Sequence, residues 1–130
     1  MVVDTSAVLA ILLQENDAAR FAEAIEAVER PMISAASVVE AGIVLIARYG
    51  DEACADLEAL LEAGSLRVEA VTAEQGAIAL DAFRAFGKGR GHGAALNFGD
   101  CLAYALAKAS EQPLLFKGGD FSRTDIQSAL

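Results

Sequence analysis

The sequence has few of the residues that would support a disulfide scaffold, a zinc site or a membrane segment. It contains two cysteines, one histidine and no tryptophan among 130 residues. Cys54 and Cys101 lie far apart on predicted helices without a CxxC partner, which favours buried free thiols over a bridge or a zinc site. The longest apolar run, AVLAILL, is far too short to span a bilayer. We therefore expect no disulfide, no zinc and no membrane anchor.

The start of the chain carries no pattern of a removable signal, because a predicted strand begins at residue 2 without a basic segment before it. We expect a cytoplasmic protein. The length suits one compact domain over residues 1–130, large enough to bury a core without staples.

Basic residues are scarce, and the net charge is -9. Such a balance argues against an unaided electrostatic grip on nucleic acid. The exception is RAFGKGRGH at residues 84–92, a basic stretch in a chain whose segments 15–29 and 51–62 are mainly acidic. This stretch could hold a polyanion locally.

Short apolar segments alternate with helical patterns along the whole chain. Strands are predicted at 2–4, 31–34, 66–71 and 113–117, and helices at 6–14, 17–29, 36–48, 51–63, 73–86 and 98–110. Asp51 is a predicted N-cap, and Gly50 and Gly64 are predicted helix stops. This order predicts the α/β class: an α/β/α sandwich around a mainly parallel sheet of four or five short strands.

Four acidic residues fall near the predicted carboxyl ends of these strands, where parallel sheets collect their ligands. Asp4 ends the first strand and Asp120 follows the last. Glu40 enters a helix soon after the second strand, and Asp100 opens the helix before the last.

Each acid has a structural alternative when taken alone. Asp4 and Asp120 could cap the segments that follow them. Residues 37–40, SVVE, match a capping box, in which the Glu side chain reaches back to the Ser N–H. Asp100 could be a first-turn acid of a helix capped by Asn97. Four such acids from separated segments at one sheet edge are harder to explain by capping.

Carboxylates brought together repel one another and rise in pKa unless a cation neutralises them. The absence of a Cys or His cluster makes the ligand set all oxygen, which suits Mg²⁺ or Mn²⁺. Such an ion supports hydrolysis of phosphodiester bonds. No GxSxG or Walker sequence offers another chemistry.

The segment GKGRGHG at 87–93 is predicted to be a loop. Lys88 and Arg90 are candidate phosphate contacts. His92 is a third candidate, although a solvated loop residue is the simpler interpretation.

Four stretches, MVVDTSAVLAIL, SAASVVEAGIVL, GKGRGHGAALNFGDCLAYALAK and LLFKGGDFSRTDI, resemble in order and spacing the VapC-type toxins of the PIN-domain ribonuclease family. The resemblance covers essentially the whole chain. It departs from the family at Gly119, where relatives often carry a polar or acidic residue, and at GHGA (91–94), where many have Pro.

The resemblance implies divalent-metal-dependent RNA cleavage, a homodimer and inhibition by a cognate VapB-type antitoxin. Asp4, Glu40, Asp100 and Asp120 would be the acidic quartet and metal ligands, with Thr5 or Ser6 assisting. Two other interpretations remain: a catalytically inactive binding protein of the same fold, or a metal-dependent DNA nuclease. We expect the antitoxin near Val8, Ile11 and Leu12, beside the acidic segment 15–29.

Overall fold

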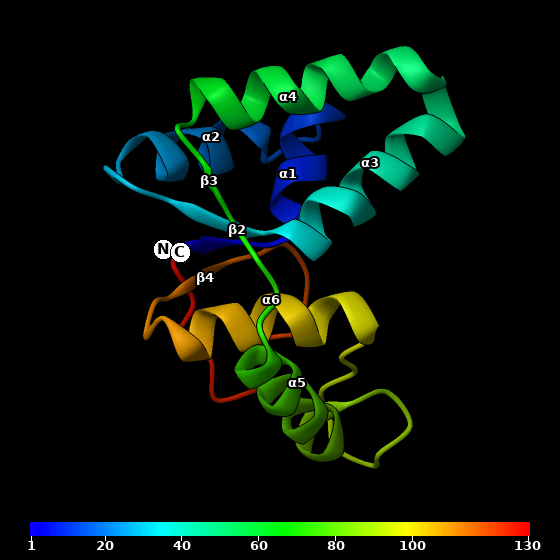
Figure 1. Ribbon diagram of the computed structural model, residues 1–130, viewed down its shortest axis with the longest axis vertical. Coiled ribbons are helices and arrows are strands. Elements are labelled where there is room, and N and C mark those ends of the chain that lie inside the picture. The colour runs from blue at the N-terminus through cyan, green and yellow to red at the C-terminus, as the bar shows by residue number, and fades with distance from the viewer.

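The computed structural model describes residues 1–130, and its centre is a sheet of four short parallel strands. The strands are β1 (Val2–Val3), β2 (Met32–Ser34), β3 (Arg67–Glu69) and β4 (Leu114–Leu115), in the order β3-β2-β1-β4 (Figure 1). Because β4 joins the far side of β1 after β2 and β3 have joined the near side, the order switches between β1 and β4. The carboxyl ends of these two strands are where a ligand site is expected.

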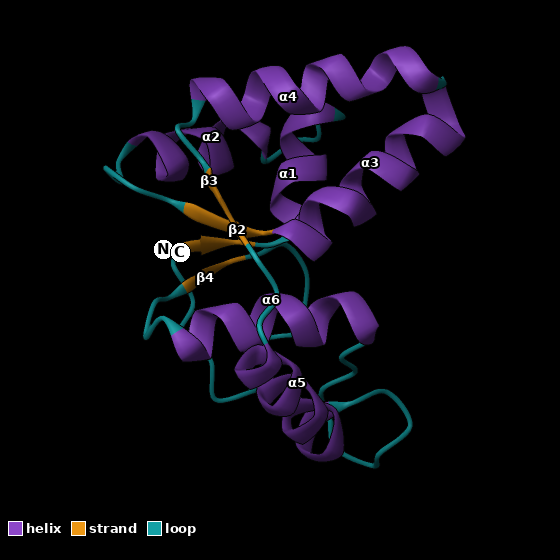
Figure 2. Ribbon diagram, viewed as in Figure 1, coloured by secondary structure: helices purple, strands orange, loops and turns teal.

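Helices cover both faces of the sheet (Figure 2). On one side lie α1 (Thr5–Leu12), α2 (Ala18–Glu26), α3 (Ala35–Tyr49) and α4 (Cys54–Ala63), which a short 3₁₀ turn at Asp51–Ala53 precedes; on the other lie α5 (Ala73–Phe86) and α6 (Phe98–Ala109). The predicted α/β/α sandwich is confirmed, and every strand pair is parallel.

Alternation along the strands builds two cores, one on each face of the sheet. Val3 and Leu115 belong to the cluster beneath α1–α4, whereas Val2 and Leu114 belong to the cluster beneath α5 and α6. Neighbouring residues of a strand point to opposite faces, so two apolar residues in succession serve both layers. This is why the strands read as continuous apolar runs.

Several predicted boundaries shift by a few residues. The strands are shorter than predicted, and α3 begins at Ala35 because β2 ends at Ser34. Gly50, at φ 88°, ends α3 as predicted, and α4 stops before Gly64. The prediction of Asp51 as an N-cap is wrong: it lies inside the 3₁₀ turn, which has no side-chain cap.

Both cysteines are free, as predicted, with Cys54 half-buried and Cys101 buried. None of the helices combines the length and the apolar character needed to cross a membrane.

Candidate active site

Asp4 is the junction between β1 and α1. Its backbone N–H donates to Leu115 of β4 (2.9 Å), and its side chain caps α1, with Oδ2 accepting from the Ser6 N–H (2.9 Å) and the Ser6 hydroxyl (2.5 Å). The Ser6 hydroxyl also accepts from the Lys117 N–H (2.9 Å), just after β4. Ser6 therefore fixes one carboxylate oxygen of Asp4 at the point where the strand order switches.

Burial raises the pKa of the Asp4 carboxyl, which is only 3% exposed. The hydrogen bonds from Ser6 act in the opposite direction, and the charge of Glu40 adds to the rise. A buried carboxylate with a second acid as neighbour is costly to keep ionised. Capping alone does not explain why an acid, rather than a serine, stands here.

The structure corrects the capping-box interpretation of Glu40. Ser34, not Ser37, is the N-cap of α3, and its hydroxyl accepts from the Ala36 N–H (3.2 Å). Ser37 lies inside the first turn, where its buried hydroxyl has no hydrogen-bond partner. Glu40 instead accepts a 2.6 Å hydrogen bond from the Thr5 hydroxyl, so α1 holds an acid of α3.

Gly99 lets Glu40 approach the start of α6. A Cβ atom at Gly99 would lie 2.6 Å from both carboxylate oxygens of Glu40, closer than real contacts allow. The absence of a side chain at Gly99 therefore leaves the space that the Glu40 carboxylate occupies, one residue before Asp100. No signal in the sequence analysis identified this contact.

Asp100 takes part in the capping box of α6, and its carboxylate also interacts electrostatically with the other three acids. Its Oδ2 accepts from the Asn97 N–H (2.8 Å), and its own N–H donates to Asn97 Oδ1 (2.9 Å), so the predicted Asn97 cap is confirmed. Burial, helped by the charges of Asp4, Asp120 and Glu40, raises the pKa of Asp100 to about 6 against the hydrogen bond from Asn97. Capping and membership of an acidic site are both true of this residue.

Asp120 completes the group from the segment after β4. It is exposed and follows Gly118, whose φ of 95° favours glycine, and Gly119. Its carboxylate has no hydrogen-bond partner, and its charge reaches Asp100. The structure thus brings the four acids from four segments to one edge of the sheet.

The four acids suit a hard divalent cation, although no three carboxylates are already placed around one point. All their donors are oxygens, and none of the four forms an ion pair with a lysine or arginine. Even Lys117, at the end of β4, turns its ammonium away to Glu15 and Asp17. Burial and, to a smaller extent, neighbouring charges raise the pKa of Asp4 and of Asp100; a bound cation would relieve both costs, and the oxygen set matches Mg²⁺ or Mn²⁺.

The basic loop at 87–93 leaves the end of α5, projects away from the sheet and returns toward the start of α6, the helix that carries Asp100 (Figure 1). Lys88, Arg90 and His92 are exposed, and none is paired with a carboxylate. His92 is more than a solvated side chain: its ring packs edge-on against Phe86 at 5.2 Å, and its Nδ1 accepts from the Ala94 N–H (3.2 Å). In the neutral ring this leaves Nε2 as the donor.

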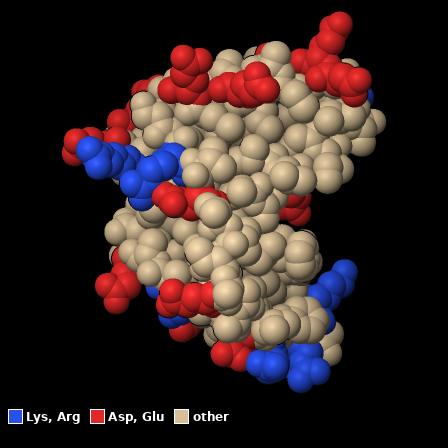
Figure 3. Space-filling model, viewed as in Figure 1, with Lys and Arg blue, Asp and Glu red and all other residues tan.

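Charged side chains of both signs are spread over the face seen in Figure 3, but acidic side chains line α4 and one group of basic side chains lies at the end formed by α5 and its following loop. A polyanion would meet its least unfavourable field at the loop.

An apolar surface flanks the acids and was missed in the sequence. It comprises Val39 and Ile43 of α3, Leu80 and Phe83 of α5, and Phe98 between them, the last 82% exposed. Two open apolar hollows share Phe98. We call these five residues the Phe98 surface.

The antitoxin surface expected on α1 is wrong in one part. Val8 is fully buried in the core and cannot contact a partner, whereas Ile11 and Leu12 are half-buried and pack against the same core.

Comparison with known proteins agrees with this geometry. The model of the PIN domain family matches residues 1–127. The chain belongs to the PIN-domain family. It is 48% identical over 130 residues to Ribonuclease VapC28 of Mycobacterium tuberculosis, covering 100% of this chain and 98% of that protein. It is 46% identical over 126 residues to Ribonuclease VapC of Mycolicibacterium smegmatis, covering 97% of each. The resemblance to VapC-type ribonucleases is confirmed over the whole chain.

Two solved structures share the PIN fold. One is the M. tuberculosis VapC20 toxin, described as cleaving the Sarcin-Ricin loop, with a TM-score of 0.77, 21% identity, and 96% of this chain and 95% of that chain covered. The other is a toxin-antitoxin complex from Klebsiella pneumoniae, with a TM-score of 0.70, 14% identity, and coverage of 95% and 92%.

Proposed function

We propose that this chain is a metal-dependent endoribonuclease and the toxin of a type II toxin-antitoxin pair. One observation carries the proposal. The carboxylate of Asp100 lies close enough to Asp4, Glu40 and Asp120, from three other segments, for their charges to raise its pKa, and none of these acids forms an ion pair with a basic side chain. Full-length relatives named as VapC ribonucleases support the reaction class.

Asp4 and Asp100 are the proposed principal ligands of Mg²⁺ or Mn²⁺, with Glu40 and Asp120 completing the site. A bound ion of this kind polarises a phosphoryl oxygen and lowers the pKa of water. The chain's own contribution is orientation. Ser6 donates hydrogen bonds to one carboxylate oxygen of Asp4, and the Asn97 N–H donates to one carboxylate oxygen of Asp100. The Thr5 hydroxyl donates to Glu40.

The proposed substrate is RNA, held by phosphate contacts from Lys88, Arg90 and His92. These residues carry no metal-binding carboxylate, so their role is positioning of the strand. Relatives named as ribonucleases support an RNA substrate for this chain, and the VapC20 toxin is described as cleaving the Sarcin-Ricin loop.

A homodimer is the proposed assembly, and the Phe98 surface is its proposed interface. Large apolar side chains that remain exposed together, such as Phe98 at 82% and Ile43 at 61%, mark an interaction surface rather than a solvated face. The second proposed partner is a VapB-type antitoxin, in keeping with the toxin-antitoxin neighbour. We propose that both are met in the cytoplasm.

The test compares cleavage of matched RNA and DNA oligonucleotides in Mg²⁺, Mn²⁺ and EDTA. Ion-dependent cleavage of RNA alone is expected. Cleavage of DNA in preference to RNA would favour the DNA nuclease, and binding without cleavage would favour the inactive binding protein. Inducible expression of the chain with and without its neighbouring open reading frame tests the toxin role, because growth arrest should be relieved by the neighbour.

A further inference from the structure

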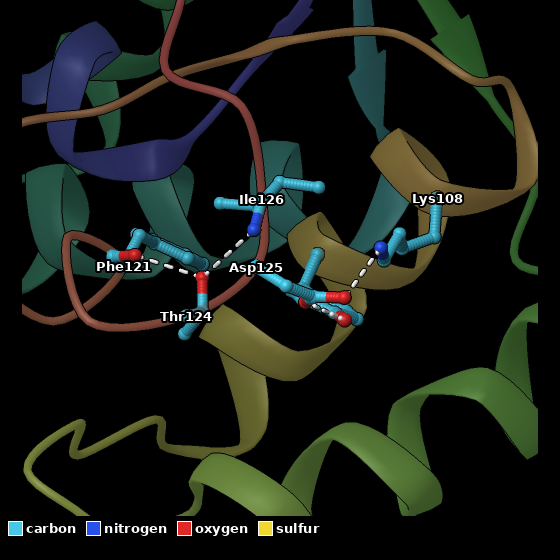
Figure 4. A network of polar contacts seen from close by, with 6 residues as sticks. Lys108, Phe121, Thr124, Asp125 and Ile126 are labelled. Atoms are coloured by element: carbon cyan, nitrogen blue, oxygen red, sulfur yellow. Dashed lines mark hydrogen bonds and ion pairs between the residues drawn. The ribbon is translucent and has the colours of Figure 1, made fainter.

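The segment that follows Asp120 is firmly attached to the rest of the molecule. Phe121 is buried and packs against Phe116, with ring centroids 5.1 Å apart. The Thr124 hydroxyl donates to the Phe121 carbonyl (2.8 Å) and accepts from the Ile126 N–H (3.2 Å), as Figure 4 shows. The backbone of Arg123 therefore lies in a turn that is fixed on its amino-terminal side.

The carboxyl-terminal side of the same turn is fixed by Asp125. Its carboxylate accepts from the Tyr104 hydroxyl (2.5 Å) and the Lys108 ammonium (2.7 Å), both on α6 (Figure 4). The bond from Lys108 holds the pKa of Asp125 below its usual range, so the carboxylate stays ionised and bound. Arg123 is thus presented from a rigid base.

The side chain of Arg123 lies on the basic loop. Its Nη1 donates to the Gly93 carbonyl (3.2 Å), and a Cβ atom at Gly93 would stand 2.8 Å from Nη1 and 3.0 Å from Cδ. Apart from the Gly87 N–H, which donates to Phe83 at the end of α5, this is the only hydrogen bond that joins residues 87–93 to any part of the chain outside 86–96. Arg123 consequently links the loop to the segment that carries Asp120.

The positive charge of Arg123 is not neutralised by any carboxylate of the protein. It forms no ion pair, and one bond to a carbonyl leaves most of its five N–H donors free. Lys88 and Arg90, on the loop to which Arg123 is bonded, are also unpaired. A guanidinium fork in this state matches the geometry of a phosphate.

We propose that Arg123 binds a phosphate of the RNA strand and, through Gly93, positions the 87–93 loop beside the acidic site. The inference rests on the proposed function and adds to it a positioning residue that the sequence analysis did not consider.

The test measures affinity of the full chain for a labelled single-stranded RNA by fluorescence anisotropy in EDTA, where hydrolysis is prevented. Arg123→Ala should weaken binding about fivefold and reduce the slope of log affinity against log salt by about 0.7, the value for one phosphate contact on a single strand. Arg123→Lys should recover part of the affinity, because it keeps the charge but loses the fork. The matched control is Arg30→Ala, an exposed, unpaired arginine just before β2 at the opposite edge of the sheet.

Gly93→Ala separates positioning from charge. The φ of Gly93 is not in the left-handed region, so alanine is tolerated by the backbone, and its methyl group displaces only the Arg123 side chain. Gly93→Ala should weaken RNA binding about twofold to threefold in the presence of Arg123 and should have no effect in the Arg123→Ala background. Turnover assays in Mn²⁺ should show a raised KM with kcat within about twofold for both variants.

An Arg123→Ala affinity equal to that of Arg30→Ala would overturn the phosphate contact. An undiminished Gly93→Ala effect in the Arg123→Ala background would overturn the positioning of the loop. Wild-type protein that binds RNA but cleaves none in any divalent ion would overturn the proposed hydrolysis, while the affinities would still decide the role of Arg123. Absence of RNA binding by the wild type would overturn both.

Discussion

The acidic cluster and the basic loop, which precedes the helix of Asp100, are built in opposite ways. Three of the four acids are held by short hydrogen bonds from helix starts: Asp4 by Ser6, Glu40 by Thr5 and Asp100 by Asn97. The loop has four glycines in seven residues, and Arg123 is the only side chain from outside the loop that donates a hydrogen bond to it. The comparison teaches that atoms proposed to hold an ion are preorganised, whereas groups proposed to hold a long polyanion keep freedom to adapt.

The largest expected effect is the loss of turnover when an acid of the acidic cluster is replaced. Asp4→Asn and Asp100→Asn should each lower RNA cleavage by at least about a hundredfold, because each removes an ionised oxygen ligand while keeping the cap geometry. Circular dichroism should show an unchanged fold. Asp81→Asn is the matched control, since Asp81 is an exposed acid on α5 paired with Arg84. Turnover of either site variant at the wild-type rate would remove these acids from the site.

Variants of Glu40 and Gly99 test whether the position of the Glu40 carboxylate affects turnover. Glu40→Gln keeps the hydrogen bond to Thr5 but removes the charge, and should lower turnover about tenfold or more. Gly99→Ala should lower turnover by a similar factor, because its methyl group would lie 2.6 Å from the Glu40 oxygens, although alanine favours the helix. In the Glu40→Gln background, Gly99→Ala should add little. Additive losses would mean that Gly99 acts on something other than the carboxylate.

Substitutions in the basic loop should affect substrate binding rather than chemistry. Replacing Lys88 and Arg90 together by alanine should raise KM for RNA about fivefold to tenfold and flatten its salt dependence, with kcat changed by about twofold or less. Steady-state kinetics at several salt concentrations provide the check. A fall in kcat at constant KM would place these residues in the chemistry instead and would remove the contrast between the acidic cluster and the basic loop.

The smallest effect is a pH dependence of stability in the metal-free protein. The pKa of Asp100 is about 6 in the folded chain, above its ordinary value of 3.8, so the folded state holds a proton that the unfolded state has lost between these values. Raising the pH from about 4 to 7 therefore favours unfolding, and the melting temperature should fall by roughly 5 °C more in wild type than in Asp100→Asn. Parallel melting curves of the two proteins would show that Asp100 is not strained by its neighbours.

The sequence predicts the layers well because they depend on apolar periodicity. It predicts the wrong cap for α3, since SAAS offers two serines and the pairing of Ser34 with Glu69 of β3, which no local pattern shows, extends β2 to Ser34. The exposure of Phe98 could not be read from its apolar character. The contact between Gly93 and Arg123 joins residues 30 positions apart, which no local pattern encodes.

Titration calorimetry of Mn²⁺ binding to the full chain at pH 7 tests the central claim most directly, because it requires neither substrate nor turnover. The account predicts saturable binding to the wild type, unchanged in the Asp81→Asn control and weakened at least about tenfold in Asp100→Asn. Equal affinity of Mn²⁺ for wild type and Asp100→Asn, or no binding to the wild type, would contradict the claim that these acids form a metal site.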